Sequence, residues 1–201
     1  MENLMDKHLV DSVYISKEEQ RKLAVQLLLS SIGEDIYREG LKDTPDRVMR
    51  MYEEIFFGYM CDPKEILARD FDAGNYQDMI LVKDIPFYSH CEHHMVPFFG
   101  VVHIAYVPEK RVVGISKLAR LVECFGRRLQ IQERLTSQIA DTIEEVLQPK
   151  GVGVVVTAEH MCMTMRGVQK PGSKTTTSAM RGVFFDEPEA RAELLSLIGL
   201  K

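Results

Sequence analysis

The order of strand-like and helix-like segments in the second part of the chain constrains the fold more than any other feature. Two apolar, β-branched or aromatic runs come first, two segments with the periodicity of amphipathic helices follow, and two further strand-like runs come last. In chain order these segments are residues 79–85, 98–107, 116–125, 135–149, 151–165 and 175–185. The order ββααββ predicts an α+β fold in which an antiparallel four-stranded sheet carries both helices on one face.

Helix signals fill the N-terminal part of the chain. Ser16 and Glu19 have the spacing of a capping box, and Gly33 is a suitable stop for the helix that they begin. Thr44-Pro45-Asp46 then starts a second helix, with the threonine as N-cap and the proline at the first helical position, and this helix should end near Gly58. We expect both helices to serve as packing elements.

An acidic stretch at residues 70–78 contains Asn and Gly and is expected to be a loop. It divides a helical segment, residues 1–72, from a sheet domain, residues 73–201, which should finish with a short helix over residues 188–198. A four-stranded sheet leaves two edges that need covering. Either other subunits or the N-terminal helices could cover them, and the sequence leaves both alternatives open.

The overall composition is that of a soluble globular protein. The chain has 201 residues, of which 45% are hydrophobic and 27% charged, and its apolar runs have the length of strands and not of membrane spans. The N-terminus has no apolar signal segment, and the four scattered cysteines do not resemble a secreted disulfide framework. We therefore expect a cytoplasmic protein without a membrane partner.

The charge balance separates two classes of ligand. A net charge of −5 argues against nucleic-acid binding, which requires a basic face. It does not argue against a small anion, because Lys117, Arg120 and Arg166 fall in the same part of the chain as the metal motif described next.

Cysteine and histidine residues form two short motifs about seventy residues apart, Cys91-Glu92-His93-His94 and His160-Met161-Cys162. Cys91 and His94 can reach one ion from a single turn, and Cys162 can complete a Cys₂His ligand set with a vacant fourth position. An open zinc site of this kind is typical of catalysis. His93 and His160 would then stand where protons must be moved if the metal activated water.

Two other classes of protein contain related residues. A closed structural zinc site needs a fourth ligand, which His93, His90, Cys124 or Cys61 could supply, and such a site would give no turnover. A zinc deaminase also activates water at a metal, but its H-x-E and P-C-x-x-C arrangement is absent here. If His90 is not a ligand, we expect it to be a solvent-facing loop residue.

Four motifs carry a resemblance to a known family. They are FYSHCEHHMVP at residues 87–97, GISKLAR at 114–120, RLQIQERLT at 128–136 and HMCMTMRGV at 160–168. In this order and spacing they resemble GTP cyclohydrolase I, and the resemblance extends from about Thr44 to the C-terminus.

The resemblance implies a fold, an assembly and a reaction. The family has the tunnelling fold (T-fold), built as ββααββ, and forms a homodecamer of two face-to-face pentamers with active sites at subunit junctions. We expect the guanine reader of one chain to meet the metal ligands of its neighbour. The reaction converts GTP and water to formate and 7,8-dihydroneopterin triphosphate, the first step of tetrahydrofolate and pterin synthesis. Allosteric regulation is a further expectation.

The resemblance also assigns roles to individual residues. Zn²⁺ would be bound by Cys91, His94 and Cys162, and its bound water would attack C8 of guanine. His93 and His160 are expected to transfer protons as the imidazole ring opens. Ser116, which we expect to cap a helix, would lie near the ribose, where it could assist the sugar rearrangement.

Substrate recognition falls to a second set of residues by the same resemblance. Glu133, with Gln132 beside it, would accept hydrogen bonds from N1–H and the 2-amino group of guanine. A structural alternative is that Glu133 is a surface residue paired with Arg134 or Ser137. The triphosphate would be bound by four cationic residues, which are Lys117, Arg120, Arg166 and Arg47.

Overall fold

The computed structural model describes residues 15–200, which divide into two compact units, one ending at Ile55 and the other beginning at Phe56. The boundary expected between residues 72 and 73 falls inside the second unit. Within the described part of the chain, no helix is long and apolar enough to cross a membrane.

The first unit contains two helices, α1 (Lys17–Ser31) and α2 (Thr44–Ile55). The predicted capping box is confirmed, because the Glu19 N–H donates to Ser16 Oγ and the Ser16 N–H donates to the Glu19 carboxylate. Lys22 of α1 forms an ion pair with Asp46 of α2 at 2.7 Å. None of the residues of α1 is buried, so these helices do not enclose an apolar core of their own.

A five-stranded sheet forms the centre of the second unit, with the strand order β5-β2-β3-β6-β7. Its strands are β2 (Ile80–Cys91), β3 (Pro97–Val107), β5 (Leu129–Gln130), β6 (Gly151–His160) and β7 (Lys174–Gly182). The four long strands are antiparallel, as predicted, whereas the two-residue β5 pairs in parallel with the end of β2.

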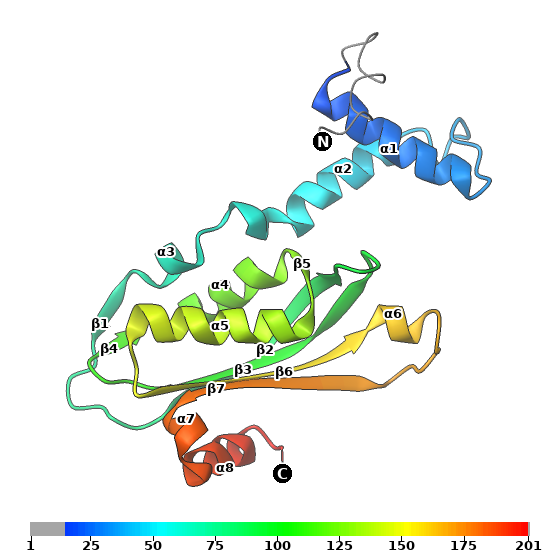
Figure 1. Cartoon of the computed structure of the whole chain (residues 1–201). Coiled ribbons are helices and arrows are strands. Elements are labelled where there is room, and N and C mark those ends of the chain that lie inside the picture. Colours follow the sequence, from blue (N-terminus) through cyan, green and yellow to red (C-terminus); the bar gives the residue numbers. More distant parts are fainter. Residues whose placement is uncertain (1–14, 201) are drawn as a thin grey trace, which may run out of the picture. The chain divides into compact units, whose positions relative to one another are not determined.

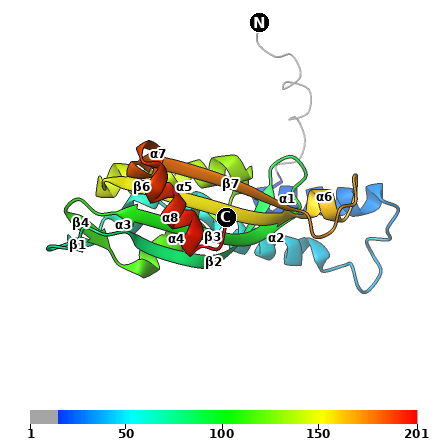
Figure 2. The same cartoon turned by 90° about the horizontal axis from the view of Figure 1, so that it is seen from below.

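Both faces of the sheet are partly covered by helices. Helices α4 (Ile115–Gly126) and α5 (Gln132–Leu147) lie on one face (Figure 1). On the other face lie α7 (Val183–Asp186) and the predicted C-terminal helix, α8 (Pro188–Leu197), which are below the strands in Figure 1, and α8 is in front of them in Figure 2. The α+β fold of the ββααββ type is therefore confirmed.

The main apolar core lies between the sheet and the pair α4 and α5. Phe87, Leu118, Leu135 and Val154 come from four different elements and are almost completely buried there. A smaller cluster around Phe184 and Leu194 holds α7 and α8 against the sheet. Burial of such side chains contributes roughly 1.5–3 kcal/mol each to the free energy of unfolding. This packing therefore holds α4 and α5 in place on the sheet.

Residues before the sheet add elements that the sequence pattern did not indicate. A 3₁₀ turn (Phe57–Met60) and α3 (Pro63–Leu67) lead to β1 (Asp70–Asp72), which pairs with β4 (Arg111–Val113). The prediction of a loop over residues 70–78 is therefore wrong at its start. An ion pair between Asp70 and Arg111 closes this small sheet.

Strand β2 is longer than the strand predicted over residues 79–85, because it continues through Pro86 to Cys91. Side chains continue to alternate along this stretch, with Phe87 and Ser89 buried and Tyr88 exposed. Only the turn at residues 92–96 separates β2 from β3.

Two other strands are shorter than predicted. β6 ends at His160 and is followed by a one-turn helix, α6 (Met161–Thr164), instead of continuing to Met165. β7 ends at Gly182, where φ is +54° and a Cβ atom would lie 2.1 Å from the Lys150 carbonyl oxygen. Only glycine fits that close approach, and the chain turns there into α7.

The start of α4 also differs from the prediction. Gly114 is the N-cap residue and makes no side-chain bond to the helix, so Ser116 is a residue of the first turn and not the cap. Helix α5 spans residues 132–147 and confirms the second predicted helix.

Candidate active site

The turn between β2 and β3 carries the first two predicted metal ligands. The Cys91 N–H donates to the Val96 carbonyl oxygen at 2.9 Å, and the N–H groups of His94 and Met95 donate back to the Cys91 carbonyl oxygen. Met95 has a φ of +55°, a left-handed conformation that tightens the turn. These main-chain bonds bring Cys91 and His94 to the same place.

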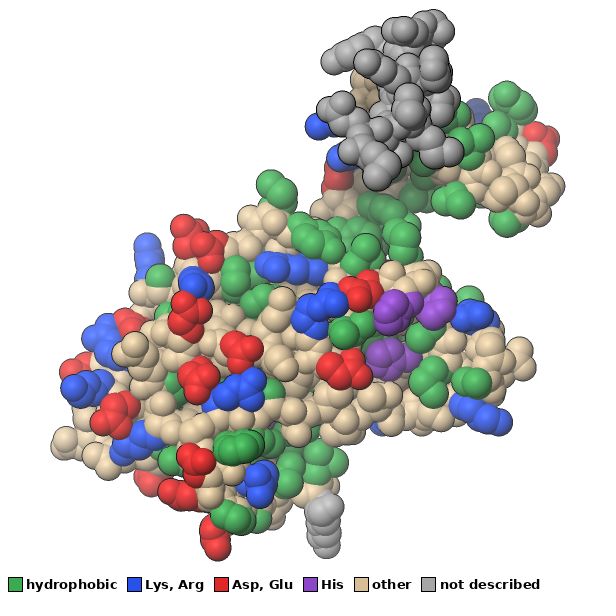
Figure 3. All heavy atoms as spheres, viewed as in Figure 1, with side chains coloured by type: hydrophobic (Ala, Val, Ile, Leu, Met, Phe, Trp, Pro, Cys, Tyr) green, Lys and Arg blue, Asp and Glu red, His purple; other side chains and the backbone are tan. Residues whose placement is uncertain are grey.

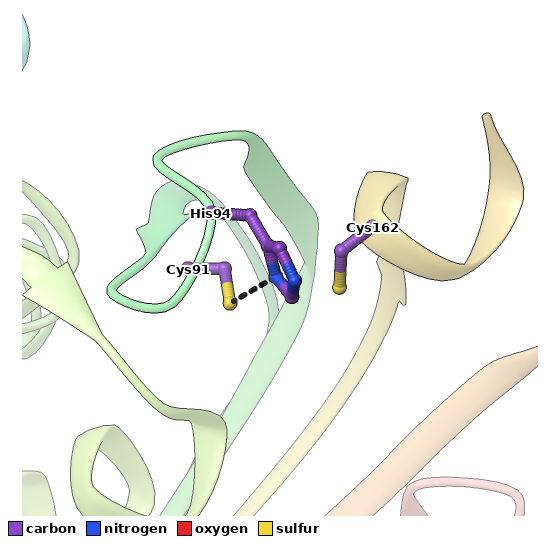
Figure 4. Close-up of side chains that lie close together, drawn as sticks. All are labelled: Cys91, His94 and Cys162. Carbon is purple, nitrogen blue, oxygen red and sulfur yellow. Dashed lines mark hydrogen bonds between the residues drawn. The ribbon is translucent and has the colours of Figure 1, made fainter. Parts of the chain in front are cut away.

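Cys162 completes the group from α6 on the far side of a short gap (Figure 4). Ligand atoms of Cys91, His94 and Cys162 all lie within 4.8 Å of one another, and Cys91 Sγ is 3.8 Å from His94 Nδ1. Tetrahedral zinc with Zn–S of about 2.3 Å and Zn–N of about 2.0 Å requires a sulfur–nitrogen separation of about 3.5 Å. The three residues therefore fit zinc.

Electrostatics of the two thiols agree with a cation site. Burial and the neighbouring Cys91 raise the pKa of the Cys162 thiol, because two thiolates repel each other in a partly desolvated place. A bound divalent cation would remove this repulsion and favour both thiolates.

A closed four-ligand site is not formed by the residues considered earlier. Within residues 15–200 the group that could hold a metal has three members. Cys124 Sγ instead lies 3.3 Å from Arg128 Nη2 and 3.9 Å from the Cys61 carbonyl oxygen. This favours the open, catalytic type of site.

His93 lies beside the metal group on the same turn. Its Nδ1 is 3.8 Å from Cys91 Sγ, and its Nε2 is 3.9 Å from Glu92 Oε1. The side chain is 65% exposed. His93 is thus accessible to a substrate that reaches the metal group. Figure 3 shows several histidine side chains gathered in one place on the surface.

Glu92 is a residue that the sequence analysis missed. Arg134 of α5 donates two hydrogen bonds to its carboxylate, at 2.6 and 3.0 Å, and this pair holds the pKa of Glu92 below its usual value. The bond ties the metal-bearing turn to the first turn of α5. No local spacing could reveal a pair whose members are 42 residues apart.

His160 is held more firmly than His93. Its ring stacks on Phe98 at 4.7 Å between centroids and 2° between planes, and its Nε2 lies 2.8 Å from Gln132 Oε1. Burial lowers the pKa of His160, and the nearby Glu133 carboxylate acts in the opposite direction. The ring is therefore partly buried and lies close enough to Glu133 to feel its charge.

Glu133 and Gln132, at the start of α5, differ in exposure. Glu133 is exposed in the first turn, whereas the Gln132 side chain is 1% exposed and donates hydrogen bonds to carbonyl groups of β6 and β7. Glu133 stands between Gln132, which contacts His160, and Arg134, which contacts Glu92. The structural alternative paired Glu133 with Arg134 or Ser137. Arg134 pairs with Glu92 instead.

This position corrects the expectation that Glu133 meets the metal ligands only across a subunit boundary. The same chain places Glu133 next to His160 and to the metal-bearing turn. Glu133 and the candidate metal group therefore lie near each other within one chain.

The residues expected to bind the triphosphate lie in separate parts of the structure. Arg166 follows α6 and acts electrostatically on Cys162. The first half of α4 carries Ser116, Lys117 and Arg120. The other end of α4 leads to β5, in which Gln130 pairs with Cys91 of β2. Ser116 is therefore roughly 15 Å along the helix from the end near the metal group, and one chain does not bring these residues together.

Two further predictions concern residues outside this group. Arg47 lies on α2 of the first unit, where it pairs with Asp43 at 3.5 Å. His90 was expected to be a solvent-facing loop residue, and this is wrong. It lies in β2 with its Nδ1 buried and its ring edge against Phe56, and burial lowers its pKa.

Comparison with known proteins agrees with this geometry. Residues 21–199 match the family GTP cyclohydrolase I. The chain is 61% identical over 183 residues to GTP cyclohydrolase 1 of Carboxydothermus hydrogenoformans, covering 90% of this chain and 95% of that protein. It is 58% identical over 188 residues to GTP cyclohydrolase 1 of Caldanaerobacter subterraneus subsp. tengcongensis, covering 93% of this chain and 99% of that protein.

A third relative, GTP cyclohydrolase 1 of Geobacillus kaustophilus, is 61% identical over 180 residues, covering 89% of this chain and 95% of that protein. A crystal structure of the archaeosine synthase QueF-Like in the apo form matches 52% of this chain and 93% of that one, with 18% identity and a TM-score of 0.44, too low to bear on function. The family match and the identities leave one conclusion, which is that this chain belongs to the GTP cyclohydrolase I family.

Proposed function

We propose that this chain, a GTP cyclohydrolase I by family, hydrolyses GTP to formate and 7,8-dihydroneopterin triphosphate with Zn²⁺ bound by Cys91, His94 and Cys162. The observation that supports this most is the convergence of those ligand atoms within 4.8 Å, with His93 and His160 beside them. The reducing cytoplasm suits a site made of two thiols. The product would enter tetrahydrofolate or pterin synthesis.

Bound zinc would supply a Lewis acid that activates water for attack at C8 of guanine. Cys91 and Cys162 would moderate its acidity, since two thiolates donate more charge than imidazoles do. His93 and His160 would move protons to and from the ring nitrogens as the imidazole opens. His93 suits exchange with solvent because it is exposed, whereas the stacked His160 suits a fixed position against the base.

Glu133 would read the base. Its carboxylate is exposed in the first turn of α5, beside His160, where it could accept hydrogen bonds from N1–H and the 2-amino group of guanine. Adenine lacks this pair of donors. The same α5 turn would thus fix the base and the proton-transfer imidazole relative to each other.

The triphosphate site would be assembled from two copies of the chain. Arg166 belongs to the metal half-site, whereas Ser116, Lys117 and Arg120 sit at the far end of α4. A neighbouring copy would bring its α4 residues to the substrate, as in the expected decamer of two pentamers, and Arg47 would add a cation from the helical segment. Ser116 would then approach the ribose.

Mixed oligomers test this division of the site. Subunits carrying Lys117→Ala and subunits carrying Cys91→Ala, each inactive alone, should recover activity when mixed, because some junctions then join two intact half-sites. The matched control mixes Glu133→Ala with Cys91→Ala and should recover nothing, since both changes damage the same half-site. Recovery in the control, or none in the first mixture, would contradict the division.

The activity itself is measured by incubating the zinc-loaded protein with GTP and assaying formate together with a pterin that fluoresces after oxidation. We expect both products from GTP and neither from ATP. Zinc retained without formate would instead indicate a structural metal.

A further inference from the structure

The Gln132 side chain makes an unusually complete set of hydrogen bonds for a residue beside an active site. Its Nε2 lies 3.0 Å from the Val156 carbonyl oxygen, 3.0 Å from the Thr175 carbonyl oxygen and 3.1 Å from Thr177 Oγ1. Its Oε1 lies 2.8 Å from His160 Nε2. The residue is 1% exposed, so these partners replace water completely.

Two of the partners fix which way the amide faces. Carbonyl oxygens can only accept hydrogen bonds, so the amide NH₂ must face Val156 and Thr175. The opposite orientation would set the amide oxygen against these two carbonyl oxygens with no hydrogen between them. The Gln132 Oε1 atom must therefore face His160.

The fixed amide in turn selects the form of the imidazole. An amide oxygen has no hydrogen to donate, so the 2.8 Å contact is a hydrogen bond only when His160 Nε2 carries the hydrogen. In the neutral ring the lone pair is then on Nδ1. The stack on Phe98, at 4.7 Å and 2°, fixes the plane of the ring, and the amide fixes its direction within that plane.

We propose that Gln132 is a positioning residue that holds His160 as its Nε2–H tautomer and makes Nδ1 the ring nitrogen available to the reaction. This inference rests on the proposed function, in which His160 transfers protons. It gives Gln132 a different part from the substrate contact expected from its position beside Glu133, because its side-chain hydrogen bonds are all made within the chain.

The direct test is nitrogen NMR of the zinc-loaded oligomer in the solid state, with isotope-labelled histidine and the His160 signals assigned by comparison with His160→Asn. The wild-type protein should show a neutral His160 ring protonated at Nε2. A neutral ring protonated at Nδ1 overturns the proposal without any variant of Gln132. The readout does not require turnover, so it is separate from the test of the activity.

Two substitutions test whether the Gln132 amide selects the His160 tautomer. Gln132→Met keeps the length of the side chain but removes the acceptor, and we expect His160 to lose its preference for the Nε2–H tautomer. Gln132→Glu in its protonated form still donates toward the Val156 carbonyl group and keeps an acceptor opposite His160, so it should retain the Nε2–H tautomer. An unchanged tautomer in Gln132→Met would show that the Phe98 stack and the strand are sufficient.

Kinetics separate positioning from general damage. In Gln132→Met, kcat for formate release should fall about tenfold to a hundredfold with KM changed only a few-fold, because the base is still bound by Glu133. The matched control is Gln138→Met on the same helix, which removes a half-buried amide acceptor from Gln130 but does not touch His160. An equal loss of kcat in both variants would contradict a specific effect on His160, and formation of no formate by the wild type would instead refute the proposed function.

Discussion

The two sides of the candidate site are built in different ways. On the α5 and β6 side, His160 is stacked on Phe98 and bonded to Gln132, which is itself buried. On the metal side, Cys91 and His94 lie on a short turn held by main-chain bonds and by one ion pair between Glu92 and Arg134. The difference teaches that side-chain packing and a buried amide fix the His160 ring, whereas Cys91 and His94 are held by main-chain bonds and one ion pair at the surface.

The metal side should therefore show the largest effects when a ligand is removed. Cys162→Ala should lose both bound zinc and formate release to below detection, because two protein ligands do not hold the ion. His93→Ala should keep about one zinc per chain, as the wild type does, and lose activity only. Metal analysis and the formate assay on the same preparations check this, and loss of zinc in His93→Ala would mean that the site is closed by four protein ligands.

On the fixed side, Glu133→Ala should change recognition and leave the metal in place. Loss of a charged acceptor costs about 2 kcal/mol, which corresponds to roughly a thirtyfold weaker discrimination of GTP from ATP. Competition binding of the two nucleotides to the zinc-loaded protein measures this. Undiminished selectivity would show that guanine is read elsewhere.

The ion pair that joins the two sides should have a smaller effect. Glu92→Gln keeps the shape of the side chain but weakens the bond to Arg134, so the metal-bearing turn loses its anchor on α5. We expect zinc affinity to fall about tenfold while the His160 tautomer is unchanged. Titration with a zinc chelator provides the measurement, and Arg134→Gln should reproduce the result if the pair is responsible.

The smallest effect concerns a histidine outside the site. His103 is 6% exposed and accepts a hydrogen bond at its Nδ1 from the Asp84 N–H at 3.2 Å. Burial lowers its pKa below 6.5 in spite of the Asp84 carboxylate, and Lys83 acts in the same direction as burial. The folded state therefore favours the neutral ring.

The sign of the pH effect follows from that shift. Between the folded pKa and about 6.5 the unfolded chain binds more protons, so the contribution of His103 is complete above about pH 6.5 and is lost as the pH falls toward the folded pKa. The free energy of unfolding, measured at fixed protein and zinc concentrations, should fall less between pH values of about 7.5 and 5.5 in His103→Gln than in the wild type. An equal fall in both proteins would show that His103 does not contribute to the pH dependence of stability.

Sequence reasoning predicted the parts of the site that depend on local spacing. Periodicity gave the ββααββ order, and the Cys-x-x-His motif with Cys162 gave the group that the structure brings together. The bond from Gln132 to His160 and the pair of Glu92 with Arg134 join residues 28 and 42 positions apart. Such contacts depend on how α5 lies on the sheet, which periodicity does not specify.

The exposed helical segment shows the same limit from another direction. The capping box of Ser16 and Glu19 correctly indicated a helix. We expected this helix to be a packing element, yet its residues Leu23, Leu27 and Leu28 are 44%, 61% and 68% exposed. A local pattern can predict that a face is apolar, but it does not say what covers that face.

X-ray absorption at the zinc edge tests the central claim most directly, since it reports the ligands of the bound ion in the intact oligomer. The account predicts two sulfur atoms at about 2.3 Å, one imidazole nitrogen and one further light atom that is not imidazole, and predicts that the spectrum is unchanged in His93→Ala. Two imidazoles, or fewer than two sulfur atoms, would contradict an open Cys91, His94 and Cys162 site.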